Sequence, residues 1–527
     1  MKKITSILLA VMMILGVCGS AMLTIGAEET SDKWDGTASI KWYLDGPNAD
    51  DEYELKSAED LAGLAFLVGA ANPEGRYAGV YYRADGSVAG YAPGSGDSAY
   101  RDSALIPSSF DGLTSVNGDT FLGKNVVLTV DVVLNEGNAA DWATSAPANM
   151  WQPIGGNVDL AASSTGFDGM FDGQGHTISG LYLKTSVDTC GLFGKTGQQF
   201  PTTIKNLNIT NFYLKGRDVV GVLVGRSNKG LTVDNVHISN GYVEATTSSS
   251  AAIVATVFGG AIAFNNCSVE DVDIRGSVYM GVFTAMDVAQ DIEINNCYAK
   301  NVSAKCEGQI GLVCGRMKSG HITMRNVYAI VDFETTGTET TANSRLSAAG
   351  LVYGVAGDNS KPSVRTIENF FYIASIKTTD DETLINTDMA NLATSVELAQ
   401  ITGETAKIMM PSFDYDTIWK TVEGDTPVIE VRGSALEDDT ENGGDEDEDE
   451  DDDLLLPDDN GGSSNGGNSS NKNNKNDKTD TTETKDNAGI TDATTDDKKG
   501  CGSVVGFAGL ALVAVLSGAA VMLKKED

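Results

Sequence analysis

The segment FDGMFDGQGHTISGL, residues 167–181, gathers the side chains of this sequence that are best suited to acid–base chemistry. Asp168 and Asp172 could serve as the carboxylate pair of a glycoside hydrolase, and either could act with His176 as general acid and base. The segment also contains four glycines and two phenylalanines, which permit tight turns and fill a core. We interpret it as the structural opening of a fold, and catalysis is the alternative.

A second group of residues with binding chemistry lies in a Tyr- and Gly-rich segment between residues 73 and 120. Exposed tyrosines offer a flat apolar face with a polar tip, which suits stacking on sugar rings or packing in a protein interface. Alternatively, YAGVYY (77–82) is a strand whose tyrosines cover the start of the fold. In the binding interpretation, deletion of residues 76–101 spares folding and removes ligand binding. The candidate ligand-binding residues are Arg76, Tyr77, Tyr81, Tyr82, Arg83, Tyr91, Tyr100 and Arg101.

Two short motifs recur along the middle of the chain with a common step of about 30 residues. The first has a small residue within an apolar run, at Gly191, Gly221, Ala251, Gly281, Gly311 and Gly350. The second centres on an asparagine, and its positions are Asn206, Asn235, Asn266, Asn296, Asn326 and Asn369. Two independent motifs with one period indicate a repeat architecture in which each repeat is one structural unit.

Apolar residues alternate on both sides of each asparagine, which is the pattern of β-strands. The alternation changes phase at the asparagine, as in Ile204 before Asn206 and Leu207 after it. This change predicts a corner between two strands, and stacked corners predict a parallel β-helix, for which we expect eight or nine coils. We expect the asparagines to form a ladder of amide hydrogen bonds, with a ligand-binding role as the alternative. A second corner is predicted at Asn211, Asn240, Asp271 and Asn301.

The outer columns of this β-helix do not favour an enzyme. The residue before each repeated asparagine would face outward, yet this column lacks a run of carboxylates; it reads Lys205, Asp234, Asn265, Asn295, Arg325 and Glu368. The sequence also has no phosphate-binding loop, no nucleophile elbow and no metal-ligand spacing. We expect no metal and no cofactor, and a carbohydrate-active enzyme is the alternative to a binding protein.

Cysteine placement predicts stacking inside the coils. Cys267 and Cys297 occupy equivalent inward positions of successive repeats, so their α-carbons should lie within disulfide range, about 4.8 Å apart. Because inward side chains of parallel coils point in the same direction, we favour a ladder of free thiols over a disulfide.

The ends of the β-helix are expected to carry short capping helices. At the N-terminal end, Ser57 and Asp60 form a candidate capping box for a helix over residues 57–68, and its apolar face would close the first coil. The predicted organisation has six parts: a signal peptide (1–27), an N-terminal cap with the Tyr/Gly-rich insertion (28–120), the repeats (121–378), a C-terminal cap (379–433), a disordered acidic stalk (434–500) and a transmembrane anchor (501–527).

The two termini predict a compartment. Lys2 and Lys3 precede an apolar run, the layout of a secretory signal peptide, and residues 503–523 carry no charge over a length that crosses a membrane. The stalk between residues 437 and 499 has 22 acidic and 6 basic residues and contributes much of the net charge of −37. We expect a single-pass membrane protein with an extracellular ectodomain, and the acidic balance excludes nucleic acid as a partner.

Segments such as GVLVG and GLVYG, with SAEDLAGLAFLV, WQPIG and the 167–181 segment in order, give the chain a resemblance to a known group. It resembles bacterial surface proteins of the right-handed parallel β-helix class with GLUG motifs, over about residues 34–433. Ala251 and Ala255 depart from the glycine pattern. The resemblance implies a binding or adhesion scaffold for an extracellular glycan or a host or cell-surface protein, and a passive surface spacer is a further alternative.

Overall fold

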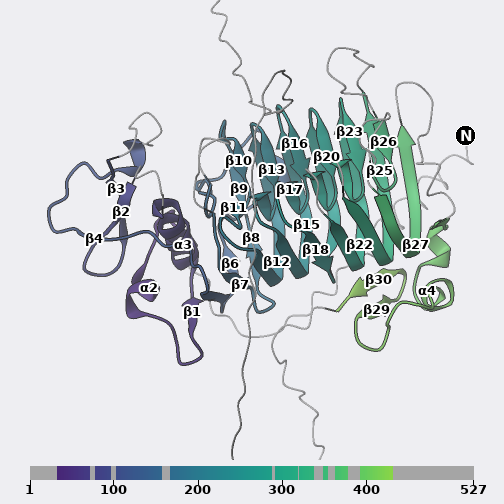
Figure 1. Cartoon of the computed structure of the whole chain (residues 1–527), viewed down its shortest axis with the longest axis horizontal. Coiled ribbons are helices and arrows are strands. Elements are labelled where there is room, and N and C mark those ends of the chain that lie inside the picture. The colour runs from purple at the N-terminus through teal and green to yellow at the C-terminus, as the bar shows by residue number, and fades with distance from the viewer. Residues whose placement is uncertain are drawn as a thin grey trace, which may run out of the picture. The chain divides into compact units, whose positions relative to one another are not determined.

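The 30-residue repeats form the coils of a parallel β-solenoid, and the chain is all-β apart from a few short helices (Figure 1). The computed structural model describes residues 33–71, 77–95, 103–156, 166–287, 291–317, 320–336, 348–353, 363–377 and 392–430. In these residues, successive coils stack parallel sheets of 14, six and five strands. The smallest sheet limits the solenoid to about five full turns. The expectation of eight or nine coils is an overcount, because the terminal coils do not contribute strands to all three sheets.

Each coil contributes one long strand to the largest sheet. These strands are β12 (Thr202–Gly216), β15 (Leu231–Ala245), β22 (Ile292–Cys306), β25 (His321–Thr335) and β27 (Ser363–Lys377), and in one coil β18 (Ile262–Asn265) and β19 (Ser268–Gly276) replace it. They pair in parallel with equivalent residues side by side, for example Ile204 with Val233. The asparagines of both predicted corners have left-handed φ values, such as 52° at Asn206 and 54° at Asn211. Asparagine tolerates this conformation better than most residues, which explains its choice at each bend.

Two rows of short strands complete the coils. One row consists of β10 (Thr189–Cys190), β13 (Val219–Gly221), β16 (Ser249–Ala251), β20 (Tyr279–Gly281), β23 (Gln309–Gly311) and β26 (Ala348–Gly350). The other consists of β11 (Phe193–Thr196), β14 (Val224–Ser227), β17 (Val254–Val257), β21 (Thr284–Asp287) and β24 (Cys314–Met317). A Cβ added at Gly221 would lie 2.2 Å from the carbonyl oxygen of Val224, so the turn between the rows needs a glycine there.

Inward side chains of the three sheets fill a continuous apolar core. The column before the corner asparagines is buried throughout, and its members are Ile204, Val233, Phe264, Ile294, Met324 and Ile367. Cys267 and Cys297 are free thiols within this core, and the Cys297 sulfur accepts a hydrogen bond from the Cys267 backbone N–H at 3.3 Å. Burial raises the pKa of Cys297 well above its usual value. The structure therefore has the thiol ladder rather than the disulfide.

The first coils are built from short pieces. β1 (Glu52–Leu55) pairs with β5 (Asn125–Leu128), which pairs with β7 (Met170–Asp172). The other pieces are α2 (Lys41–Asp45), β6 (Val132–Val133), η3 (Ala139–Asp141), β8 (Thr177–Ser179) and β9 (Tyr182–Lys184). Helix α3 (Ala58–Ala70) follows β1, and the Oγ of Ser57 accepts its first N–H bond, from Asp60, at 3.2 Å. The Asp60 carboxylate accepts from the N–H of Lys56 instead of that of Ser57, so the predicted capping box is shifted by one residue.

The Tyr/Gly-rich insertion folds into a small antiparallel sheet against α3. Its strands are β2 (Tyr77–Tyr82), β3 (Val88–Pro93) and β4 (Thr114–Val116), and the 3₁₀ turn η2 (Ser103–Leu105) lies between the last two. α3 is buried on more than the one face predicted from its sequence, because Leu67 and Ala62 are buried as well as Leu61 and Leu64. The insertion is thus part of the N-terminal core.

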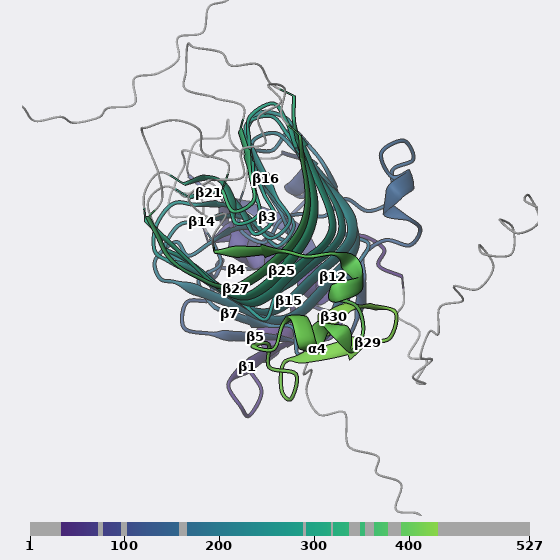
Figure 2. The same ribbon diagram turned by 90° about the vertical axis from the view of Figure 1, so that its right-hand side faces the viewer.

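The C-terminal element packs against the outer face of the solenoid. It contains β28 (Ala393–Ser395), η4 (Leu398–Gln400), α4 (Thr405–Met409), β29 (Trp419–Val422) and β30 (Asp425–Ile429). Its core includes Trp419, Phe413 and Met410, which pack on the outward-facing Tyr298 and Tyr328. Figure 2 shows this element beside the long strands of the last coils. Apart from β28, which pairs with β27, the predicted C-terminal cap therefore covers a side face rather than the open end.

No helix among the described residues is long and apolar enough to cross a membrane. The predicted signal peptide (1–27), acidic stalk (434–500) and transmembrane anchor (501–527) lie outside the described residues, so these assignments stay predictions.

Candidate functional site

Asp172, the first catalytic candidate, lies at the start of the corner ladder. Its Oδ1 accepts hydrogen bonds from Asn206 Nδ2 at 2.9 Å and from the backbone N–H of Gln174, also at 2.9 Å. Its Oδ2 forms an ion pair with Lys205 at 3.0 Å. With both oxygens engaged in holding the turn and the next coil, Asp172 has the partners of a structural residue.

Asp168, the second candidate, is buried on another side of the first coils, with 4% of its surface exposed. Its Oδ1 accepts the backbone N–H of Gln199 at 3.0 Å, which ties the 197–201 turn to the opening segment. Burial raises the pKa of its carboxyl, while hydrogen bonds from the backbone of this turn oppose that rise. His176, the third candidate, lies beside Asp131, whose Oδ1 is 3.1 Å from its Nδ1. No hydrogen bond or ion pair between these three side chains occurs in the described part of the chain, so the structure does not assemble them into one site.

The corner asparagines form a ladder with one interruption. Nδ2 of each residue donates to Oδ1 of its predecessor for Asn235 to Asn206 (3.0 Å), Asn296 to Asn266 (3.4 Å), Asn326 to Asn296 (2.9 Å) and Asn369 to Asn326 (2.9 Å). Asn266 donates instead to Asp234 at 3.0 Å. At this interruption Nε2 of His237 lies 3.1 Å from the expected acceptor, Asn235 Oδ1. These amides bond one another, which leaves them poorly placed to bind a ligand.

The candidate ligand-binding tyrosines divide into two groups. Tyr77 and Tyr91 are 3% and 1% exposed, and their rings stack with centroids 4.0 Å apart beneath α3. The Tyr91 hydroxyl also accepts a hydrogen bond from Gln152 at 2.6 Å. Neither ring offers a face to a ligand, and deletion of residues 76–101 would remove core side chains. The burial of these rings against α3 argues against the expectation that this deletion spares folding.

Tyr81 and Tyr82 are partly exposed at the end of β2, the central strand of the same sheet. The Tyr81 ring lies 5.0 Å from that of Phe110, which is 46% exposed. Arg83 donates weakly to the backbone oxygen of Val88 at 3.4 Å within its own hairpin. The remaining candidates, Arg76, Tyr100 and Arg101, lie outside the described residues.

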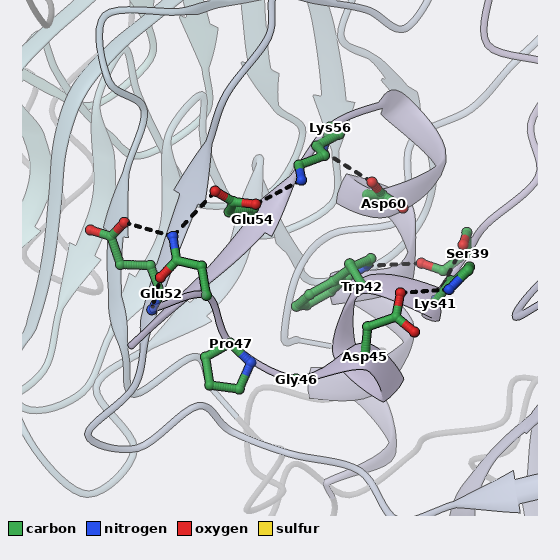
Figure 3. Close-up of a pocket in the computed structure, with 11 residues that line it drawn as sticks. Ser39, Lys41, Trp42, Asp45, Gly46, Pro47, Glu52, Glu54, Lys56 and Asp60 are labelled. Atoms are coloured by element: carbon green, nitrogen blue, oxygen red, sulfur yellow. Dashed lines mark hydrogen bonds and ion pairs between the residues drawn. The ribbon is translucent and has the colours of Figure 1, made fainter. Parts of the chain in front are cut away.

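A cleft of about 340 Å³ lies in the N-terminal region, between α2, the turn after it, β1 and the start of α3 (Figure 3). Sequence patterns did not single out these residues, because they belong to three different local elements and share no motif. The only available signal was the concentration of charged residues between positions 41 and 60. The lining residues are Ser39, Lys41, Trp42, Asp45, Gly46, Pro47, Asn48, Glu52, Glu54, Lys56 and Asp60.

Strand β1 positions two carboxylates on the wall of this cleft. Glu52 and Glu54 are two residues apart on one strand and therefore point to the same side. The amide nitrogen of Asn48 donates to both, at 3.3 Å to Glu52 Oε2 and 3.2 Å to Glu54 Oε1. The Asn48 Oδ1 in turn accepts the backbone N–H groups of Asp50 and Glu52, each at 2.9 Å, which fixes the turn before β1.

Two lysines that line the cleft form ion pairs, and both side chains are largely exposed. Lys56 Nζ lies 2.7 Å from Glu54 Oε2, and Lys41 Nζ lies 2.5 Å from Asp45 Oδ2. Lys56 and Asn48 lower the pKa of the Glu54 carboxyl through hydrogen bonds, and Glu54 raises the pKa of Lys56. Burial raises the pKa of Asp60, which lies in the first turn of α3.

One aromatic side chain, Trp42, lines the cleft. Trp42 is 8% exposed, and its indole N–H donates to the backbone oxygen of Ser39 at 3.0 Å. Its ring stacks on Phe121 with a centroid distance of 5.9 Å, so its position is fixed by the core. A rigid indole beside carboxylates, an amide and ammonium groups can bind a polar ligand that has an apolar face.

In the described residues no group of three or more His, Cys, Asp and Glu side chains is arranged to hold a metal ion. The residues that line the cleft offer hydrogen bonds, charge and an aromatic surface for recognition.

Comparisons with known proteins give partial similarities. No model of a known protein family matches the sequence. A stretch of 149 residues, 28% of this chain, is 32% identical to Halomucin from Haloquadratum walsbyi, and the match spans about 1% of the length of Halomucin. Among solved structures, the fold is similar to that of a protein described as a putative immunoglobulin A1 protease from Bacteroides ovatus, with a TM-score of 0.41 and 17% identity over 59% of this chain and 87% of that chain.

Proposed function

We propose that this chain is a bacterial cell-surface protein of the GLUG-bearing, right-handed parallel β-helix class, which displays a binding site for an extracellular glycan or protein. Support comes from the parallel solenoid, the corner asparagines and the glycines between the short strands. The apolar segment at residues 503–523 anchors the chain in the membrane, and the acidic stalk holds the solenoid away from the surface.

The observation that carries the binding role is the cleft against β1. It combines a fixed indole, two carboxylates on one strand and an amide that orients both of them. Its volume of about 340 Å³ suits a single sugar ring or one side chain of a protein partner. A passive spacer has no need for such a set of oriented groups.

A direct test is binding of the purified full-length chain to an array of extracellular glycans and to intact host or bacterial cells. Glu52→Gln and Glu54→Gln should weaken binding, and Glu293→Gln is the matched control because it removes a carboxylate on the solenoid wall, outside the cleft. If all three variants bind as the parent does, the cleft is not the binding site. Absence of any bound glycan or cell would favour the spacer.

A carbohydrate-active enzyme is the second candidate, because Glu52 and Glu54 both lie within hydrogen-bond distance of one amide nitrogen. Carboxyl groups of retaining glycosidases are about 5–5.5 Å apart, and one of them needs a raised pKa to act as the acid. Hydrogen bonds from Lys56 and Asn48 lower the pKa of Glu54, which makes it a poor general acid. Release of reducing ends from an array-identified glycan by the parent, and its loss in Glu52→Gln, would support the enzyme over the binding protein.

A further inference from the structure

The charges that line the N-terminal cleft are unequal. Four carboxylates face it, from Asp45, Glu52, Glu54 and Asp60, against two ammonium groups. Each ammonium group is already paired with a carboxylate, Lys41 with Asp45 and Lys56 with Glu54. The lining therefore carries an excess of two negative charges.

One of these carboxylates, that of Glu54, already binds an ammonium group of the same chain. Lys56 extends from the end of β1 to Glu54, its side chain is 64% exposed, and its ammonium lies 2.7 Å from the Glu54 carboxylate. Glu52 lies beside this pair on the same face of β1, and its oxygen accepts only a long bond of 3.3 Å from Asn48 among the side-chain bonds described. An added ammonium group at Glu52 would lie in a cleft that the Glu54 carboxylate and the Trp42 indole also line, and both of these groups attract cations.

We propose that the cleft recognises a primary ammonium group on its extracellular ligand. This inference rests on the proposed binding function and names the chemistry of the same site. The group can come from an amino sugar or from a lysine side chain of a protein, since both offer an ammonium next to an apolar stretch. Glu52 and Glu54 accept its hydrogen bonds, and Lys56 competes for the same carboxylates from within the chain.

This competition gives two variants with opposite effects. Lys56→Gln removes the internal ammonium and frees Glu54, so an ammonium ligand should bind about two to five times more tightly, the range expected for one exposed ion pair. Glu52→Gln removes an acceptor charge and should weaken binding by a similar factor. A neutral sugar gains no charge contact when Lys56 is lost, so its affinity should not rise. Lys56 is largely exposed, so its substitution should leave the fold intact.

The probes are glucosamine, N-acetylglucosamine and Nα-acetyl-lysine methylamide, titrated into the full-length chain and followed by NMR or calorimetry at low and high salt. Both amines should bind, with affinities that fall as the salt concentration rises, while N-acetylglucosamine should bind more weakly. Preference for glucosamine over the lysine derivative would identify an amino sugar as the source, and the reverse order would identify a protein.

Matched controls are Lys377→Gln and Glu293→Gln, which remove one partner of an exposed ion pair on the solenoid wall. Neither should change the affinity for the amines. The inference is overturned if N-acetylglucosamine binds as tightly as glucosamine, or if Lys56→Gln fails to tighten amine binding. Should array ligands bind but prove neutral, the ammonium inference fails and the binding function stands. Should the amines bind while no glycan or cell does, the ammonium inference stands and the proposed binding of an extracellular glycan or protein fails.

Discussion

The corner ladder can be tested at Asn296, whose side chain has a ladder bond on each side. Its Nδ2 donates to Asn266 at 3.4 Å and its Oδ1 accepts from Asn326 at 2.9 Å. Its φ of 50° lies in the left-handed region. Asn296→Leu removes both bonds and leaves two neighbouring amide groups without their partners. It also puts a leucine in a left-handed backbone conformation that is energetically unfavourable for this residue.

The expected cost follows from these contributions. Two partly exposed hydrogen bonds contribute about 1–2 kcal/mol together, and the left-handed conformation costs leucine about 1 kcal/mol. The free energy of unfolding should therefore fall by about 2–3 kcal/mol, measured by urea denaturation with circular dichroism as the probe. Asn296→Asp keeps an oxygen that accepts the bond from Asn326, and aspartate tolerates the left-handed conformation. The free energy of unfolding should therefore fall less in this variant.

Asn369→Leu is the matched comparison, because Asn369 also has a left-handed φ but has one ladder bond among the described residues, to Asn326. Its loss should be smaller than that of Asn296→Leu by about 1 kcal/mol. If the two leucine variants lose equal stability, the bonds of the ladder contribute nothing and the backbone conformation alone explains the asparagines. If Asn296→Leu is as stable as the parent, the corner assignment itself is refuted.

Three further predictions concern the opening segment, the insertion and a histidine. Asp172→Asn should lower the free energy of unfolding by about 1 kcal/mol, because it weakens the contact to Lys205. Ligand binding should not change. Loss of glycan cleavage in a folded Asp172→Asn chain would instead show that this residue is catalytic. Tyr91→Ala should cost about 3–5 kcal/mol in urea denaturation and Tyr81→Ala less than about 1 kcal/mol, since only the first ring is buried; equal losses would contradict the packing of this sheet on α3. Burial lowers the pKa of His237 to about 4, below its unfolded value near 6.5, so the stability associated with the neutral ring is complete above about pH 6.5 and is lost as the pH falls toward 4. The parent should lose about 1–3 kcal/mol more than His237→Asn between pH 7 and pH 4, and parallel pH profiles of the two urea midpoints would refute this.

Much of the solenoid could be predicted from the sequence because the same pattern of buried and corner residues recurs in each repeat. Ile204, Asn206 and Leu207 have counterparts in each coil, and the equivalent residues pair side by side. A left-handed φ favours asparagine, aspartate or glycine for local steric reasons, so Asn206 reveals its position without any knowledge of distant contacts. At Gly221 a Cβ would also meet Ala255 of the next coil, and the equivalent position of that coil is Ala251.

The number of full turns and the position of the C-terminal element could not be predicted this way. A single strand motif does not show whether its coil also contributes to the other sheets. Tyr298 and Tyr328 have the alternation of outward residues, and only the tertiary structure shows that Trp419 and its neighbours cover them. Outward aromatic residues look alike in the sequence whether solvent or another element faces them.

The candidate sites depended still more on tertiary structure. Residue types alone made Tyr91 and Asp172 candidates for binding and catalysis, but the side chains around them give both a structural environment. No motif in the sequence marked Glu52 and Glu54 as site residues, because the cleft forms only where Trp42, Asn48 and Asp60 converge from separate segments. The repeated backbone conformation follows from the sequence, because it depends on local sterics and on periodic burial. The convergence of polar side chains in the cleft depends on contacts between residues far apart in the chain, and no local pattern relates those residues.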